Sequence, residues 1–264
     1  MMVNPSKLYQ HYSRDDREFV DKTLEWLNQV ENTYHFLVTP FLNPHQLEIV
    51  QQLTVHRGLQ FFASSSFWPS EEARVILAPD YYSLEREDFQ IELLEISYPS
   101  KFYQLKHGQI LGTLLHQLGV ERWTFGDILV REGQAQLLVE TRFSQYFIDH
   151  ISKIAKVPVQ LKKISLDQML QLEQELKSRD ILVSSLRLDK LVAESFRLSR
   201  KQAVELIASR QVKVNYGVLD NPSRPLQLGD WISVRKFGRI HLIEDKGLSK
   251  SGKHKLRVEL LLSK

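Results

Sequence analysis

Apolar residues recur at helical spacing near the start of the chain. Positions three and four residues apart predict a helix over residues 14–30. A second helix is expected to begin at Asn43, which is followed by a proline and so is typical of an N-cap and a first helical position. The segments 59–63 and 74–78 then have the composition of strands. Together these elements predict a small α/β domain over residues 1–82.

The next section alternates strand-like and helix-like segments in the order βαββαβ, the ferredoxin-like arrangement that RNA-recognition motifs also use. Glu132-Gly133 predicts the hairpin turn between its second and third strands. The third strand, AQLLVE, lacks the exposed aromatic residues on which RNA-recognition motifs stack bases, so the sequence favours a structural role for this sheet. The expected segments are 91–98, 109–118, 125–130, 135–140, 142–155 and 157–163.

An amphipathic pattern follows over residues 165–178, where four apolar residues share one side. It predicts a helix that docks on the middle domain and leads into a linker at 179–185. The predicted domains are therefore a middle domain with a trailing helix, 83–180, and a third domain, 181–264. The expected class of the whole chain is α+β.

Two helices are predicted at the start of the third domain. Apolar residues at helical spacing from Leu188 form one face of the first helix, and Arg187 and Lys190 flank that face from the solvent side. Ser199, followed three residues later by Gln202, is the capping-box pattern that begins the second helix.

The first turn of this second helix carries Arg200 and Lys201. Cations there face the positive end of the helix dipole at a cost of roughly 0.3–1 kcal/mol each, so something else should favour them. Free backbone N–H groups beside an Arg and a Lys form a phosphate site, which an RNA backbone would occupy. The alternative interpretation is two solvated surface cations that tolerate the dipole.

Further along the third domain, apolar and polar residues alternate in two segments, and each alternation predicts a half-buried strand. The first segment surrounds Lys213, and the second spans 231–235. Gly238 and Arg239 are expected to break or bend the second strand. Lys213, Arg235 and Arg239 would then extend the basic surface that begins on the helices.

The charge distribution separates the third domain from the rest of the chain. Up to Asp180 the chain carries 18 basic and 24 acidic residues, a net charge of −6; beyond it there are 17 basic and 8 acidic residues, a net charge of +9, which together give +3. A localised positive field is typical of a polyanion-binding domain carried on an acidic body. A lysine-rich solubilising tail is the alternative, since residues 246–255 partly have that composition.

The composition argues against several kinds of site. The chain has no cysteine, which excludes a disulfide or thiolate zinc site and fits a reducing cytosol. His45 and Glu48 share a predicted helix face but lack a third metal ligand, and no phosphate-binding or nucleophile motif occurs. No segment has the apolar run of a signal peptide or a membrane span. We expect a cytoplasmic monomer with no catalytic residue, metal, cofactor or membrane contact.

The sequence RLDKLVAESFRLSRKQAVELIASRQVKVNYGVL, followed by LGDWISVRKFGRI, resembles the S4 domain shared by several RNA-binding proteins. The resemblance implies two helices packed on a small sheet, with the paired helices docking on an RNA helix or junction. Asp189 is expected to orient neighbouring cations and not to do chemistry. By this resemblance the RNA-binding residues would be Arg187, Lys190, Ser199, Arg200, Lys201, Gln202 and Lys213.

S4 domains are also joined to enzymes, and each class makes a different demand on the sequence. A pseudouridine synthase would place a catalytic domain after the module, where we expect too few residues beyond Ile243. A tyrosyl-tRNA synthetase would show HIGH-like and KMSKS-like segments, and a methyltransferase a correctly spaced glycine-rich loop; the chain shows neither.

The remaining order, an α/β domain, a ferredoxin-like domain and a terminal S4 module, resembles the bacterial YlmH family. The segments SEEARVIL, HGQILGTLLHQLGVERWTFGDILV and SSLRLDK spread this resemblance over most of the chain. Two departures are that residues 64–66 are serines where the family has glycines, and that the RG-x-GR end of the module reads RKFGR over 235–239.

The family resemblance implies a non-enzymatic protein that binds the large ribosomal subunit obstructed by peptidyl-tRNA. Its S4 module would lie between 23S rRNA and the tRNA anticodon arm and would support tail addition in ribosome-associated quality control. Two alternatives stay open: an RNA-modifying enzyme with an active site before residue 180, and a division-linked adaptor whose acidic body contacts another protein.

Overall fold

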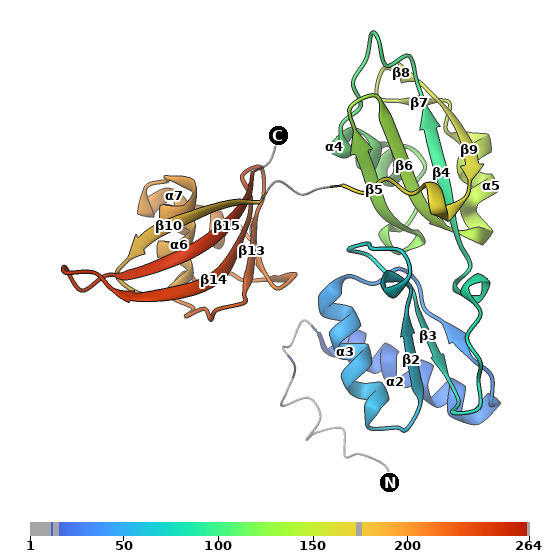
Figure 1. Cartoon of the computed structure of the whole chain (residues 1–264), viewed down its shortest axis with the longest axis horizontal. Helices are drawn as coiled ribbons and strands as arrows, with labels where there is room; N and C mark the ends of the chain where they lie inside the picture. The colour runs from blue at the N-terminus through green and yellow to red at the C-terminus, as the bar shows by residue number, and fades with distance from the viewer. Residues whose placement is uncertain (1–11, 13–15, 173–175, 263–264) are drawn as a thin grey trace. The chain divides into compact units, whose positions relative to one another are not determined.

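The computed structural model describes Tyr12, residues 16–172 and residues 176–262, which fall into two compact units (Figure 1). The first unit ends at Leu172 and the second begins at Glu173. Both units combine helices with antiparallel sheets, so the expected α+β class is confirmed.

In the N-terminal domain of the first unit, two helices pack on one face of a three-stranded sheet in the order β1-β3-β2. Asn43 caps the second helix as predicted: its Oδ1 accepts the backbone N–H of Gln46 at 3.0 Å, and the Gln46 side chain accepts the N–H of Asn43 at 3.0 Å. Arg14, at the start of the first predicted helix, lies outside the described residues. The elements are α2 (Arg17–Thr33), β1 (Leu37–Val38), α3 (Pro44–Val55), β2 (Gln60–Ala63), the 3-10 turn η2 (Ser64–Ser66) and β3 (Val75–Ala78).

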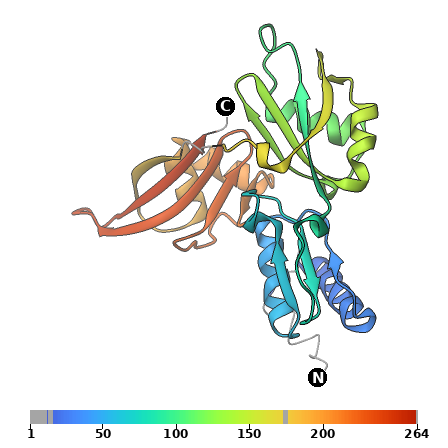
Figure 2. The same cartoon turned by 45° about the vertical axis from the view of Figure 1, so that its right-hand side comes forward.

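The middle domain has the predicted order βαββαβ (Figures 1 and 2). Its sheet order, β5-β6-β4-β9 with antiparallel neighbours, is ferredoxin-like and confirms the expectation. The second helix ends at His150 and not at residue 155, because Ile151 is extended and buried in the core. The elements are β4 (Ile91–Ser97), α4 (His107–Gly112) with a π-helical continuation (Thr113–Gln117), β5 (Phe125–Arg131), β6 (Gln134–Glu140), α5 (Thr141–His150), the hairpin β7 (Lys153–Ile154) and β8 (Val157–Pro158), and β9 (Gln160–Ile164).

The trailing helix predicted over 165–178 is wrong over residues 165–172 and 176–178, and residues 173–175 of that prediction lie outside the described residues. After one 3-10 turn, η6 (Leu166–Gln168), the chain is extended and lies on the middle sheet. The Gln136 side chain in β6 donates to the carbonyl of Gln168 at 2.9 Å and accepts the N–H of Leu170 at 2.8 Å. Met169, whose backbone is extended, and Leu170 are both buried against the middle sheet. Tertiary contacts therefore outweigh the local helical pattern.

The two domains of the first unit share a buried cation. Arg74, next to β3, donates from Nε to the carbonyl of Thr39 at 2.8 Å and from Nη1 to those of Phe89 and Gln90 at 2.8 and 2.9 Å. Its Nη2 lies 3.6 Å from the buried carboxylate of Glu140 at the end of β6. Burial lowers the pKa of Arg74 to about 10, against the opposing effect of the Glu140 charge. The guanidinium remains charged at neutral pH and links both domains.

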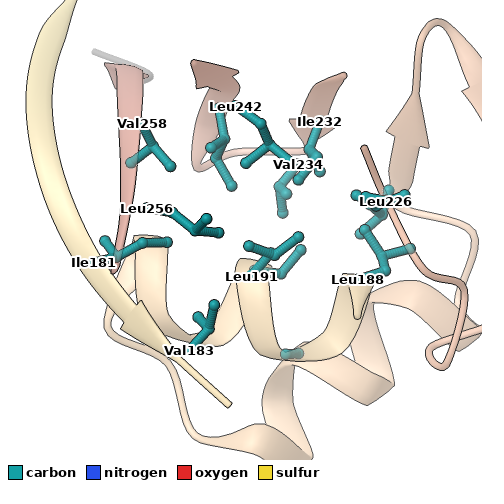
Figure 3. Close-up of a cluster of buried hydrophobic side chains, with 14 of the residues drawn as sticks. Ile181, Val183, Leu188, Leu191, Leu226, Ile232, Val234, Leu242, Leu256 and Val258 are labelled. Atoms are coloured by element: carbon teal, nitrogen blue, oxygen red, sulfur yellow. The ribbon is translucent and has the colours of Figure 1, made fainter. Parts of the chain in front are cut away.

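The second unit is built on a six-stranded antiparallel sheet in the order β10-β15-β14-β13-β11-β12. Helices α6 and α7 cover one face, and Figure 3 shows Leu188 and Leu191 of α6 against inward side chains of the sheet. The first strand occupies the predicted linker 179–185, so that prediction is wrong. The elements are β10 (Lys177–Val183), α6 (Leu188–Phe196), α7 (Arg200–Ala208), β11 (Val212–Val214), β12 (Gly217–Val218), β13 (Trp231–Val234), β14 (Gly238–Leu248) and β15 (His254–Leu262).

Gly238 begins the long strand β14, whereas the sequence predicted that it and Arg239 would break or bend a strand. Its φ is 131°, and a Cβ at this position would lie 2.0 Å from the carbonyl oxygen of Leu261. The glycine is therefore needed for the close approach of β15 and not for a break.

We expect Arg74→Leu to lower the free energy of opening of β3 and β6 by about 3 kcal/mol, because it leaves three carbonyls without their donor. The buried Glu140 carboxylate then keeps only the exposed Arg142, whose Nε lies 2.7 Å away. Hydrogen exchange in the intact chain measures this free energy of opening. The control, Lys162→Ala, breaks an exposed ion pair in which Lys162 lies 2.7 Å from Glu95. It should change the free energy of opening by less than about 1 kcal/mol. Equal effects of the two variants would contradict the role of Arg74.

Candidate nucleic-acid interface

A buried carboxylate joins the starts of the two helices of the second unit. Asp189, in the first turn of α6, has a side chain that is 0% exposed. Arg187, the N-cap of α6, binds it through two bonds, Nε to Oδ1 at 3.0 Å and Nη2 to Oδ2 at 2.9 Å. Arg200, the first residue of α7, places Nε 3.3 Å from the same Oδ2. One carboxylate thus orients two guanidinium groups from different helices.

Asp189 is held in its charged form. Burial alone would raise the pKa of this carboxyl, but the hydrogen bonds and charges of Arg187 and Arg200 outweigh burial and hold the pKa below its usual value. The carboxylate also accepts the backbone N–H of Lys190 at 3.0 Å. These contacts agree with the expectation that Asp189 orients cations.

Arg200 and Lys201 point outward from the first turn of α7. Their side chains are 68% and 87% exposed, and the nearest acidic partner of Lys201 is Glu205 at 4.0 Å. Both cations face the positive end of the helix dipole, which disfavours them there. For Arg200, part of that cost is offset by Asp189, whereas Lys201 has only a weak exposed partner.

Ser199 and Gln202 form the predicted capping box. Ser199 Oγ accepts the N–H of Gln202 at 3.2 Å, and the Gln202 side chain accepts the N–H of Ser199 at 2.9 Å. These side-chain oxygens therefore fix the geometry of the helix start. Lys190 Nζ donates to Ser184 Oγ at 2.7 Å, which holds this ammonium beside the end of β10.

The structure does not bring all the predicted cations to one surface. Lys213, Ser233 and Arg239 are paired in one row across β11, β13 and β14. Val212 and Ile240, their neighbours along the strands, point into the core beneath the helices. Because side chains alternate along a strand, Lys213 and Arg239 point to the sheet face opposite the helices. Arg235 lies exposed in the turn between β13 and β14.

Two further features near these residues were missed by the sequence reasoning. Trp231 and His241 stack on the open sheet face, with ring centroids 4.1 Å apart and planes 8° apart. Arg239 lies over the ring of Tyr216 at 5.5 Å. The alternating pattern placed Trp231 on the outward face, which was a signal for the stacked pair. The sequence did not show that His241 would be its partner on the neighbouring strand.

The other face of the middle sheet, away from its helices, is covered. Leu93 and Leu138 pack there against Phe41 of the N-terminal domain and against Met169 and Leu170. This finding fits the absence of exposed aromatic residues in AQLLVE. At these positions the sheet cannot serve as the base-stacking platform of an RNA-recognition motif.

Among the described residues, no cluster of three or more His, Asp or Glu side chains is placed to hold a metal ion. In the same part of the chain, no helix is both long and apolar enough to cross a bilayer. A shallow cleft in the N-terminal domain includes Glu31 and Asp80, and Glu31 is engaged by Arg57 at 2.6 Å.

The second unit is basic and the first acidic also when the net charge is counted at the observed boundary between the units. From Glu173 onward the chain has 19 basic and 11 acidic residues, a net charge of +8, because Lys177 and Arg179 and three acidic residues join the second unit. The first unit keeps 16 basic and 21 acidic residues, a net charge of −5.

Comparison with known proteins covers nearly the whole chain. Three family models match: "YlmH, N-terminal" at residues 15–82, "Putative RNA-binding domain in YlmH" at 85–168, and "S4 domain" at 186–232. A solved structure named Cell division protein ylmH, from Streptococcus pneumoniae, is 44% identical with a TM-score of 0.56 and covers 62% of this chain and 99% of its own. A Bacillus subtilis (strain 168) protein named Ribosome-associated protein quality control protein P2 is 34% identical over 254 residues, which is 96% of this chain and 98% of that protein. The chain, with its N-terminal, middle and S4 domains, belongs to the YlmH family.

Proposed function

We propose that this protein is a non-enzymatic RNA-binding factor that binds the large ribosomal subunit and tRNA through its S4 unit. In this role it supports ribosome-associated quality control of obstructed 50S–peptidyl-tRNA complexes. The name of the Bacillus subtilis relative supports ribosome association, and the S4 match supports RNA binding. The contacts to 23S rRNA and to tRNA, a monomeric state and a cytoplasmic location are parts of the proposal.

The observation that carries this proposal is the cluster of Asp189, Arg187 and Arg200. Here the carboxylate is buried while Arg200 and the neighbouring Lys201 extend into solvent. Two oriented guanidinium groups beside a helix N-terminus form a phosphate-binding arrangement.

The cations divide into two groups with different roles in this proposal. Arg187, Lys190, Arg200 and Lys201 hold the RNA backbone from the helix side, and Ser199 and Gln202 shape that site. Lys213 and Arg239 on the opposite sheet face, with Arg235 at its edge, contact a second segment of RNA or the tRNA. A protein with two such surfaces suits a position between rRNA and tRNA.

A second candidate function rests on the name of the Streptococcus pneumoniae relative, which favours a division-linked adaptor. The acidic first unit would then contact another protein. Affinity purification of the intact chain carrying Arg200→Ala and Lys201→Ala separates the two functions, because a division partner would persist when RNA contacts are lost.

We expect Arg187→Ala, Arg200→Ala and Lys201→Ala each to weaken binding to purified large subunits by roughly tenfold, the loss of one charge-assisted hydrogen bond of about 1.5 kcal/mol. Co-sedimentation over a salt series measures this, and the slope of log K against log salt should fall by about 0.7–0.9 per lost phosphate contact. Lys250→Ala, in the β14–β15 turn, removes the same charge elsewhere in the second unit as the control. Unchanged sedimentation of all three variants would overturn the assignment.

We expect Asp189→Asn to weaken RNA binding as well, because the amide no longer orients both arginines. The variant should also lower the free energy of opening of α6 by about 1–3 kcal/mol at neutral pH, measured by hydrogen exchange in the intact chain. Since the folded-state pKa of Asp189 is lowered, its contribution is complete above about pH 4 and is lost as the pH falls below that value. The difference between wild type and variant should therefore shrink in acid; a constant difference would contradict this role.

A further inference from the structure

One end of the middle domain gathers three stretches of the chain that are distant in sequence. Strands β4 and β5 are both antiparallel to β6, so their C-terminal ends lie at the same end of the sheet. The loop after β4 and the turn after β5 meet there, and a Cβ on Gly133 would lie 3.7 Å from Ser100. The C-terminus of α5 and the β7–β8 hairpin reach this end as well, since Gln160 pairs with Ser97. Both views show these segments together (Figures 1 and 2). We call this surface, residues 98–107, 131–134 and 150–158, the loop end.

The loop end exposes aromatic side chains. Phe102 is 82% exposed and Tyr103 is 43% exposed. At the adjacent end of α5, the rings of Tyr146 and His150 stack with centroids 4.2 Å apart. Two neighbouring exposed rings offer flat apolar faces on which a planar group such as a nucleic-acid base can stack.

The loop end is also basic. It carries five exposed basic side chains and one acidic residue, Glu132; the basic residues are Lys101, Lys106, Arg131, Lys153 and Lys156. Among the described residues, no carboxylate lies within ion-pair distance of Lys101, Lys153 or Lys156. The lysines on β9 differ: Lys162 is 2.7 Å from Glu95 and Lys163 is 2.8 Å from Glu92. Positive charge is thus neutralised on the sheet and left available at the loop end, although the first unit as a whole is acidic.

We propose that the loop end binds unpaired RNA, a loop or a single-stranded segment, with bases stacked on Phe102 and Tyr103 and phosphates held by Lys101, Lys153 and Lys156. This inference deepens the RNA-binding function proposed above and rests on it. The middle sheet is covered by Phe41, Met169 and Leu170, so RNA contacts of this domain have to use another surface. Exposed rings interleaved with cations are the combination that single-stranded nucleic acid requires, whereas a duplex hides its base faces.

The test compares two variants of the intact chain in binding to a labelled single-stranded oligouridylate of about 12 nucleotides and to an RNA duplex of similar length. The first variant is Phe102→Ala, and the second combines Lys101→Gln, Lys153→Gln and Lys156→Gln. A matched control combines Lys22→Gln, Lys162→Gln and Lys163→Gln, which removes the same charge from paired lysines of the same unit.

We expect Phe102→Ala to weaken single-strand binding by at least about fivefold, as loss of one stacked base does, with less effect on the duplex. The triple lysine variant should reduce the salt slope for the single strand by about 0.7 per lost phosphate contact, and the control should leave it unchanged. Equal losses in the triple variant and the control, or no loss from Phe102→Ala, would overturn the proposal.

Three further outcomes show which of the two proposals fails. If Arg200→Ala with Lys201→Ala weakens RNA binding while the loop-end variants do not, the loop end is not an RNA site but the proposed function stands. If none of these variants changes RNA binding, both proposals fail. Loop-end variants that bind RNA normally but lose co-sedimentation with large subunits would overturn the RNA proposal in favour of a protein contact.

Discussion

A carboxylate with no solvent contact stays charged only where cations surround it, and this requirement organises the S4 unit. Asp189 is fully buried and is satisfied by two bonds from Arg187, one from Arg200 and one from the backbone of Lys190. The contacts fix the start of α6 against the start of α7. They also orient the guanidinium groups of Arg187 and Arg200. The interaction that holds the two helices together therefore also positions the cations of the basic surface.

The first unit contains a buried charge of the opposite sign. Arg74 is enclosed by three carbonyls and Glu140, contributed by both domains of the unit. Asp127, on β5, adds a second link by accepting the N–H groups of Glu71 and Glu72 at 2.8 Å each. Gly126 beside it permits the approach of Phe41, because a Cβ there would lie 2.6 Å from that ring. The N-terminal and middle domains therefore act as one body.

Fusion of these two domains has a consequence for RNA recognition. A ferredoxin-like sheet usually presents one open face, but here that face is occupied by Phe41 and by the extended segment that follows β9. The two surfaces that we propose for RNA, the loop end and the S4 unit, avoid this covered face. The charge distribution agrees with this division, since positive charge is concentrated in the second unit and, within the first, gathers at the loop end.

Local signals in the sequence determined the parts of this protein that depend on neighbours within a few residues. The caps at Asn43 and Ser199, the turn at Glu132-Gly133 and the alternation over 231–234 all appear as predicted, because each is set by hydrogen bonds or periodicity inside one element. The S4 resemblance likewise identified the cations around Asp189, and the charge split located the basic unit.

Only the tertiary structure decided where long-range contacts compete with local preference. Residues 165–172 have a helical pattern, yet they form only one 3-10 turn before the side chain of Gln136 and the burial of Met169 and Leu170 hold the chain on the middle sheet. Pairing of β10 with β15 likewise turns a predicted linker into a strand. The pairing of Arg200 with Asp189 follows from the packing of α7 beside α6. The separation of Lys213 from both, by the thickness of the sheet, follows from the face that β11 turns to the core. A sequence shows which residues carry charge, but the cost of burying that charge is set by neighbours that only folding brings together.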